Sequence, residues 1–166
     1  MVSMSYNYSK KEIQEHCIKR EEHEKETDKY LNIFVNTYFP NRYIINRTNG
    51  QWERYDYLIY DQIKHTYCKV ECKTRNFNIN QYNKYKNEGF CLSYDKLENA
   101  DSIIYIIPIA NEILQIRTNT IKQLINEGKL KVVSKKVNRY QYTSIKDKHE
   151  EQLILIPYQY FKAYKM

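Results

Sequence analysis

Two consecutive strand-like segments constrain the fold of this chain more than any other feature. Residues 53–60 and 66–73 are both rich in β-branched and aromatic side chains, which favour extended backbone. The polar stretch between them, residues 61–65, is suited to a short connecting loop. These segments predict a β-hairpin, and a turn centred near Ile63 and Lys64 would fix its register.

The predicted register brings two carboxylates together. With that turn, Leu58 pairs with Lys69, and Asp56 lies opposite Glu71. Directly opposed side chains have Cβ atoms about 5 Å apart, so two like charges there repel each other unless a cation lies between them. A divalent metal ion meets this need, because carboxylate oxygens are its preferred ligands. Since side chains alternate along a strand, Lys73 faces the same way as Glu71, and the group predicts metal-assisted cleavage of phosphodiester bonds.

Composition agrees with a single intracellular domain that binds a polyanion. The 166 residues suffice for one domain, 1–166, and the formal charge of +7 favours nucleic acid as a partner, although many basic proteins bind none. The scarcity of Gly and Pro beside abundant Ile, Asn, Lys and Tyr is typical of AT-rich genomes, such as those of many phages and large viruses. The four cysteines have no CxxC or zinc spacing, which favours reduced thiols in the cytoplasm, an infected host cell or a virion. No run is apolar enough to predict a membrane span or a signal peptide.

Helices and further strands flank the predicted hairpin. Residues 9–38 read as one long helix or two, with Ser9 as the N-cap, and residues 43–48 read as a strand that ends at an Asn49–Gly50 turn. A short polar helix begins at Asn78 or Asn80 and stops at Gly89.

The second half of the chain adds buried strands. Residues 102–109 form a continuous apolar run, typical of a strand covered on both faces, and residues 112–117 are a candidate neighbour. Asn119 is a candidate N-cap for a helix that closes at Gly128, residues 130–145 read as a basic strand or hairpin, and residues 153–156 read as a last strand. The order predicts an α/β or α+β domain with a mixed sheet between helical layers.

This arrangement resembles the restriction-endonuclease-like, or PD-(D/E)xK, nuclease superfamily. The likeness rests on Asp56 in one strand, Glu71-x-Lys73 in the next, and a polar helix that opens near Asn80 and Gln81. It extends over residues 10–110 as an order of elements, and it implies the three-layer core of that superfamily. The sequence departs from the family name at Tyr55, where proline would stand.

The resemblance implies a role for each charged residue. Asp56 and Glu71 look like ligands of Mg²⁺ or Mn²⁺, helped by the backbone carbonyl of Cys72, and Lys73 looks like the group that orients or deprotonates the attacking water. Members of the superfamily often add an acidic residue from the first helix. Glu24 is the best candidate on spacing, and Glu21 and Asp28 are close rivals.

Further residues are candidate substrate contacts. The resemblance implies that Gln81 and Tyr82 touch the DNA backbone or position the active site, and Arg75 follows the lysine closely enough to reach a phosphate. Each also has a plainer interpretation: a solvated arginine, a polar first turn of a helix, and a tyrosine that packs on the sheet.

Alternatives remain for the site and for the function. An exposed hairpin on which Glu71 pairs with Lys69 or Arg54 would carry the same charges. The preferred function is a Mg²⁺-dependent nuclease acting on DNA, more as an endonuclease than as an exonuclease, with a homodimer left open. Its rivals are a virion-associated protein that keeps the fold without turnover, and a nucleic-acid-binding module built on the basic residues 129–139 and neighbouring tyrosines.

Overall fold

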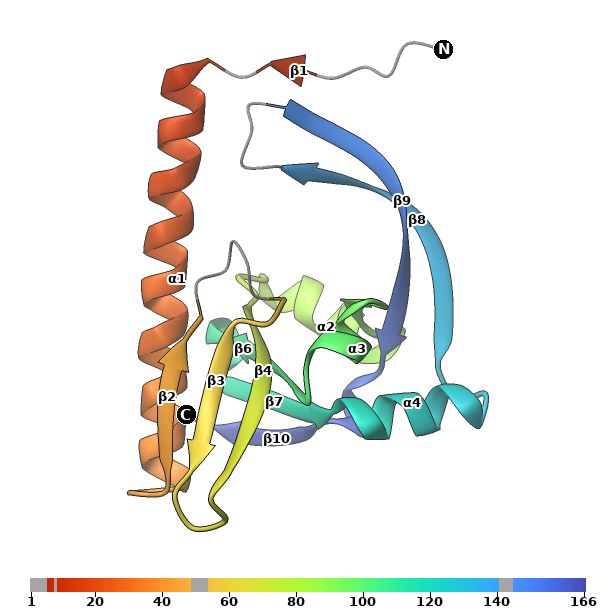
Figure 1. Ribbon diagram of the computed structural model, residues 1–166. Helices are drawn as coiled ribbons and strands as arrows, with labels where there is room; N and C mark the ends of the chain where they lie inside the picture. The colour runs from red at the N-terminus through yellow and green to blue at the C-terminus, as the bar shows by residue number, and fades with distance from the viewer. Residues whose placement is uncertain (1–5, 8, 49–53, 141–144) are drawn as a thin grey trace.

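The computed structural model describes residues 6–7, 9–48, 54–140 and 145–166 (Figure 1). For residues 6, 7, 13, 16, 136–140 and 145–149, only the backbone is described. In chain order the elements are β1 (Tyr6–Asn7), α1 (Lys10–Tyr38), β2 (Tyr43–Arg47), β3 (Tyr57–Asp61), β4 (Thr66–Thr74), α2 (Ile79–Glu88), β5 (Phe90–Ser93), α3 (Lys96–Asn99), β6 (Ser102–Ile107), the 3-10 turn η1 (Pro108–Ala110), β7 (Glu112–Arg117), α4 (Thr118–Asn126), β8 (Lys131–Tyr140), β9 (Ile145–Ile156), η2 (Tyr158–Tyr160) and β10 (Lys162–Lys165).

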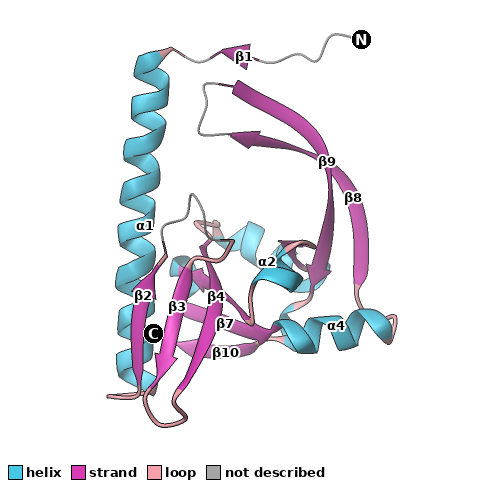
Figure 2. Ribbon diagram, in the orientation of Figure 1, coloured by secondary structure: helices cyan, strands magenta, loops and turns pink. Residues whose placement is uncertain are grey.

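A six-stranded mixed sheet forms the centre of the molecule, as predicted. Its strand order is β10-β7-β6-β4-β3-β2, and the β4–β6 pair is parallel whereas the other pairs are antiparallel. A parallel pair needs a crossover connection, and α2, β5 and α3 supply it (Figure 2). The crossover packs on one face of the sheet through Tyr82 and Leu97, and α1 packs on the other through Leu31 and Phe34.

The first helix is continuous from Lys10 to Tyr38. Ser9 caps it, because its hydroxyl accepts a hydrogen bond from the backbone N–H of Glu12 at 3.2 Å. The C-terminal half packs on the sheet, whereas the described side chains of residues 10–23 are exposed, and this part of α1 extends beyond the sheet in Figure 1. The charged middle of the sequence therefore does not break the helix.

The hairpin has the predicted register. Tyr60 pairs with Tyr67 and Leu58 with Lys69, and residues 62–65 form the turn. Strand β3 is shorter than expected at its start, because it begins at Tyr57. Of the apolar run 102–109, residues 102–107 form β6 and are buried between the two layers, as predicted, whereas Pro108 and Ile109 belong to η1 and Ile109 is exposed.

A second sheet extends from the body as a long two-stranded arm (Figure 1). Strand β9 pairs with β8 along ten residues, with β5 at its end and with β1 near its start. Residues 153–156, expected as a separate strand, are the end of β9, and β5 was not predicted. On β8, Lys135 lies opposite Glu151 and Lys136 opposite Glu150, so acidic residues face this part of the basic stretch.

Three other expectations have different outcomes. Helix α4 begins at Thr118 and shows no side-chain cap, so the prediction that Asn119 is its N-cap is wrong: Asn119 already lies inside the first turn. Residues 153–156 were expected to be the last strand, but the chain returns after them as β10 to pair with β7. The Asn49–Gly50 turn lies outside the described residues.

Helix α2 ends where the backbone makes a close approach. Asn78 and Gln81 form a capping box at its start, and Gly89 lies at its end with φ +110°, as the sequence predicts. A Cβ atom on Gly89 would lie 2.9 Å from the backbone nitrogen of Ile156 and from the carbonyl carbon of Leu155. Glycine is therefore required both by the torsion angle and by the contact with β9. Within the described ranges, no helix has both the length and the apolar character needed to cross a bilayer.

Candidate active site

The backbone of β4 holds Asp56 at the entrance to β3. The Asp56 N–H donates to the Val70 carbonyl at 3.0 Å, and the Cys72 N–H donates to Asp56 Oδ2 at 2.9 Å. The carboxylate is thus oriented by a main-chain donor between Glu71 and Lys73. Lys73 Nζ in turn lies 2.9 Å from Glu71 Oε1, so the hairpin places the three predicted side chains beside one another.

Glu71 is the centre of the cluster. Its side chain is 0% exposed, and its Oε1 lies 2.9 Å from Lys73 Nζ and 3.2 Å from Lys96 Nζ. Its Oε2 is also buried and accepts no hydrogen bond from any described residue. The exposed-hairpin alternative, with Glu71 paired to Lys69 or Arg54, is therefore wrong. A buried carboxylate oxygen without a partner is costly, so the site favours a further cation or donor there.

The environment shifts the pKa values of the two flanking groups. Burial raises the pKa of Asp56 and the charge of Glu71 adds to the rise, while Lys73, the Cys72 N–H and Lys96 oppose it without cancelling it. Burial alone would lower the pKa of Lys73, but Glu71 and Asp56 outweigh that effect and raise it. Lys73 is therefore held as a cation beside two carboxylates.

Lys96 is a member of the cluster that the sequence did not reveal. It is the first residue of the short helix α3, which Leu97 anchors in the core, and its side chain is 26% exposed. The sequence around Lys96 has no pattern that predicts a site residue, and Lys96 is distant from Glu71 along the chain. The contact depends on how the crossover folds over the sheet. A second ammonium group thus reaches the same carboxylate oxygen as Lys73.

The opposite face of β4 packs against α1. Val70 and Cys72 are buried in the core on the α1 side, and burial raises the pKa of the Cys72 thiol well above its usual range. The end of the strand is tied to the helix by a 2.7 Å hydrogen bond between the hydroxyls of Thr27 and Thr74. The backbone N–H of Cys72 has a structural role, because it donates a hydrogen bond to Asp56. The role of the Cys72 carbonyl as a metal ligand remains a prediction.

Two acidic residues of α1, Glu24 and Asp28, form ion pairs with Arg47. Glu24 forms ion pairs with Arg47 at 3.0 Å and Arg20 at 3.6 Å, and Asp28 pairs with Arg47 at 2.6 Å. Asp28 also accepts a hydrogen bond from the buried Tyr57 hydroxyl. These contacts fasten α1 to β2 and β3, and Glu24 as a metal ligand remains a prediction.

The three candidate substrate contacts have different surroundings. Arg75 is half-buried near Lys73, with its guanidinium 5.9 Å from the centre of the Tyr105 ring. Gln81 uses its side-chain oxygen to accept the Asn78 N–H at 2.9 Å, within the capping box. Tyr82 is 1% exposed and packs in the core, a burial that does not favour contact with a substrate. Their roles in binding remain predictions, of which Arg75 has the most suitable position.

The residues present are chemically suited to one divalent cation. Asp56 and Glu71 offer hard oxygen ligands from adjacent strands, and the unpartnered Oε2 of Glu71 is an acceptor still to be satisfied. Among the residues that the structure describes, no group of three or more His, Cys, Asp or Glu side chains is arranged to hold a metal. Water and substrate oxygens would have to complete the coordination, as is usual for Mg²⁺.

Comparisons with known proteins bear on the fold. No protein-family model matches the sequence, and no curated protein matches it significantly. The structure of a nuclease from a fusselovirus superposes with a TM-score of 0.54 and 16% sequence identity, over 84% of each chain. The two proteins share a fold. At this identity the likeness concerns architecture, and it agrees with a mixed sheet flanked by helices.

Proposed function

We propose that this protein is a metal-dependent nuclease that hydrolyses phosphodiester bonds, most favourably in DNA. The observation that carries the proposal is the environment of Glu71: a fully buried carboxylate with one oxygen unpartnered, the Lys73 ammonium 2.9 Å from the other, and Asp56 beside it. A salt bridge on a solvent-exposed hairpin would leave the Glu71 carboxylate accessible to water, whereas here it is fully buried. Structural ion pairs also occur in cores, but there both oxygens are normally satisfied.

Each residue has a distinct task in the proposed reaction. Asp56 and Glu71 would hold Mg²⁺ or Mn²⁺, which, when bound, supplies a Lewis acid for the phosphate and lowers the pKa of water. Lys73, kept cationic by its neighbours, orients the attacking water and stabilises the negative charge that develops on the phosphate. The Cys72 N–H keeps Asp56 oriented while this happens.

Lys96 adds a second positive charge to this machinery. In the absence of a metal ion it shares Glu71 Oε1 with Lys73, so the two ammonium groups balance the two carboxylates of the cluster. With Asp56 and Glu71 holding a cation, Lys96 would be placed to offer its positive charge to the phosphate. Arg75, which acts on Lys73 through its charge, extends the positive surface at the end of β4.

Two further findings support a nuclease. The fusselovirus protein with which this chain shares its fold is described as a nuclease. The formal charge of +7 suits a polyanionic substrate. Assignment to the PD-(D/E)xK superfamily is part of the proposal, as are cleavage within strands, weak sequence preference and a viral or phage origin.

The two-stranded arm formed by β8 and β9 does not favour the alternative of a non-catalytic nucleic-acid-binding module. A binding module built on the basic residues 129–139 needs cations free to meet phosphates. Glu150 and Glu151 of β9 lie opposite part of that stretch, and opposed charges across a sheet attract each other. The second candidate function therefore has no observation of its own to support it.

Cleavage with and without the lysine tests the proposal. Wild-type protein and Lys73→Met should be incubated with labelled DNA and with Mg²⁺, Mn²⁺ or EDTA. We expect metal-dependent cutting by the wild type and at least a hundredfold loss in the variant, since a positioned charge in the transition state contributes about 10²–10³ in rate. Lys84→Met, on the exposed surface of α2, is the control for loss of one charge. Equal cutting by all three proteins would refute the assignment.

A further inference from the structure

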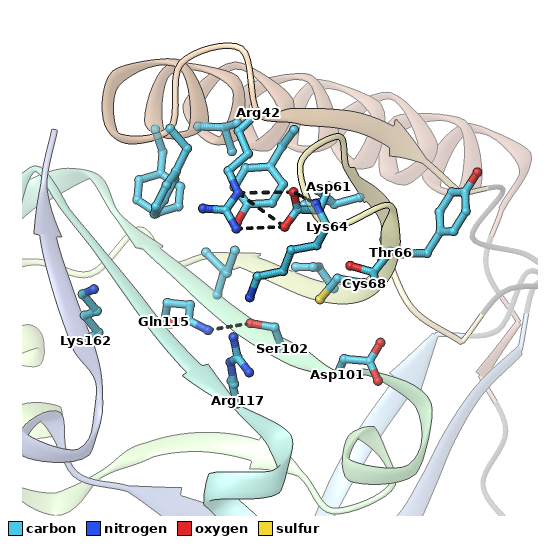
Figure 3. Close-up of a pocket in the computed structure, with 18 of the residues that line it drawn as sticks. Arg42, Asp61, Lys64, Thr66, Cys68, Asp101, Ser102, Gln115, Arg117 and Lys162 are labelled. Atoms are coloured by element: carbon cyan, nitrogen blue, oxygen red, sulfur yellow. Dashed lines mark hydrogen bonds and ion pairs between the residues drawn. The ribbon is translucent and has the colours of Figure 1, made fainter.

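A hollow of about 810 Å³ lies on the face of the sheet opposite the candidate active site (Figure 3). Its floor includes Ile59, Val70 and Ile104, which belong to the core on the α1 side. Glu71 alternates with Val70 along β4 and therefore points to the other face. Phe34 and Val35 of α1 line one side of the hollow, and neither Glu71 nor Lys73 lines it, so the hollow is separate from the proposed nuclease site. Its volume lies within the usual range of small-molecule pockets, about 300–1,000 Å³.

One wall is built by an ion pair that is already satisfied. Arg42 holds Asp61 through Nη2–Oδ2 at 3.0 Å, and the backbone N–H groups of Ile63 and Lys64 donate to Asp61 Oδ1 at 3.0 and 3.1 Å. The Arg42 hydrogen bond lowers the pKa of Asp61 to about 2, so the pair stays ionised and its charges cancel. This network fixes the β3–β4 turn, and with it the position from which Lys64 projects.

Three more cations line the hollow: Lys64, Arg117 and Lys162. Among the residues that the structure describes, none forms an ion pair with these three cations, and Lys162 lies 5.2 Å from the centre of the Tyr164 ring. The remaining carboxylate of the lining, Asp101, already accepts the Lys69 N–H at 2.9 Å. Figure 3 shows Lys64 extending into the hollow from above, and Arg117 below. The balance of charge in the hollow is therefore positive.

A neutral polar pair lies between these two cations. Gln115 donates from Nε2 to the hydroxyl of the buried Ser102 at 2.8 Å, on the floor of the hollow (Figure 3). The amide and the hydroxyl keep further hydrogen-bonding capacity, because an amide has two donors and two acceptor lone pairs. Apolar floor, polar pair and flanking cations thus lie within one concave surface.

We propose that this hollow binds a nucleotide unit, with its phosphate between Lys64 and Arg117 and its base over the apolar floor beside Gln115. A phosphate ion alone would leave most of the volume empty, and an apolar ligand would leave the cations without a counter-charge. A nucleotide matches both features, since it joins an anionic phosphate to a flat ring with polar edges. The unit is either a free mononucleotide or part of a nucleic-acid strand. The proposal does not depend on nuclease activity.

Calorimetric titration with two kinds of ligand tests the site. In an EDTA buffer at low salt, wild type, Arg117→Gln, Lys64→Gln and the control Lys84→Gln are titrated with AMP, with adenosine and with a short oligodeoxynucleotide. We expect AMP to bind at least tenfold more tightly than adenosine, and each hollow variant to weaken that binding at least tenfold, because a charged hydrogen bond is lost. Lys84→Gln should bind AMP like the wild type.

The two ligand sources give separate results. AMP binding that depends on Arg117 identifies a mononucleotide site, and oligonucleotide binding that depends on Arg117 without AMP binding identifies a strand-binding site; either supports the proposal. Binding of neither ligand, or binding that Arg117→Gln and Lys64→Gln leave unchanged, would overturn it. So would an equal loss in the Lys84→Gln control. Cleavage assays do not enter the test, so the nuclease proposal stands or fails separately.

Discussion

Replacing Lys96 with glutamine should make the candidate site bind a divalent cation more tightly. The Lys96 ammonium lies 3.2 Å from Glu71 Oε1, one of the two oxygens of the carboxylate that is proposed to hold the metal. A metal ion must therefore either displace the Lys96 ammonium from Glu71 or bind against the repulsion of its positive charge. Lys96→Gln removes both costs. Lys73 still lies 2.9 Å from that oxygen, so the buried carboxylate keeps one counter-charge and the fold should be retained.

The size of the effect follows from the distance. Two unit charges separated by the 3.2 Å of this contact interact by about 5 kcal/mol at an effective dielectric constant of about 20. Most of this interaction energy is offset when Lys96 leaves Glu71, because the Lys96 side chain is 26% exposed and the released ammonium is hydrated again. A remainder of about 1.4 kcal/mol corresponds to an affinity about tenfold higher.

Calorimetric titration with Mn²⁺ measures this directly. The matched control is Lys122→Gln, which removes the same charge from a lysine that pairs with Glu98 of α3 at 3.5 Å and has no contact with Glu71. We expect tighter Mn²⁺ binding in Lys96→Gln alone, together with slower cleavage. Unchanged or weaker binding in a folded Lys96→Gln protein, or the same gain in the control, would refute the reasoning.

Three further perturbations have defined outcomes. Glu71→Gln leaves two ammonium groups without their carboxylate, so it should lower the free energy of unfolding by about 2 kcal/mol in urea titrations and abolish cleavage; full stability would contradict this. Asp56→Asn should raise the melting temperature at neutral pH: the pKa of Asp56 is raised in the folded state, so its ionisation costs stability as pH rises through that pKa. The gain should vanish at a pH below the ordinary range of an aspartate, and a gain that persists there would argue against the mechanism. Gly89→Ala should destabilise the protein by about 2 kcal/mol in the same urea titrations, through its positive φ and the 2.9 Å contact with β9, whereas an unchanged midpoint would show that β9 can move away.

The parts of the fold predicted correctly are those with local determinants. The register of the hairpin follows from the short turn between Asp61 and Thr66, and the ends of α1 and α2 follow from Ser9, Asn78 and Gly89. Because side chains alternate along β4, the sequence was enough to place Glu71 and Lys73 on one face. The structure adds that the Glu71 carboxylate is fully buried.

The features that were missed depend on contacts distant in sequence. Lys96 joins the site only because the crossover brings α3 over the sheet, and no local pattern marks it. Strand β10 forms by pairing with the free edge of β7, and its own sequence is only four residues long, with no run of apolar or β-branched side chains to predict a strand. Asn119 is a good capping residue, yet α4 begins at the buried Thr118 with Arg117 at the N-cap position, two residues before the predicted cap.

Cleavage by wild type and Lys73→Met tests the central claim most directly. Labelled single-stranded, double-stranded, flapped and four-way-junction DNA should be incubated with each protein in Mn²⁺, in Mg²⁺ and in EDTA, after both proteins are shown to have the same melting temperature. The account predicts cutting of at least one substrate by the wild type with metal, none in EDTA, and at least a hundredfold slower cutting by Lys73→Met. Cutting at equal rates by the two proteins, or no cutting of any substrate by the wild type, would contradict it.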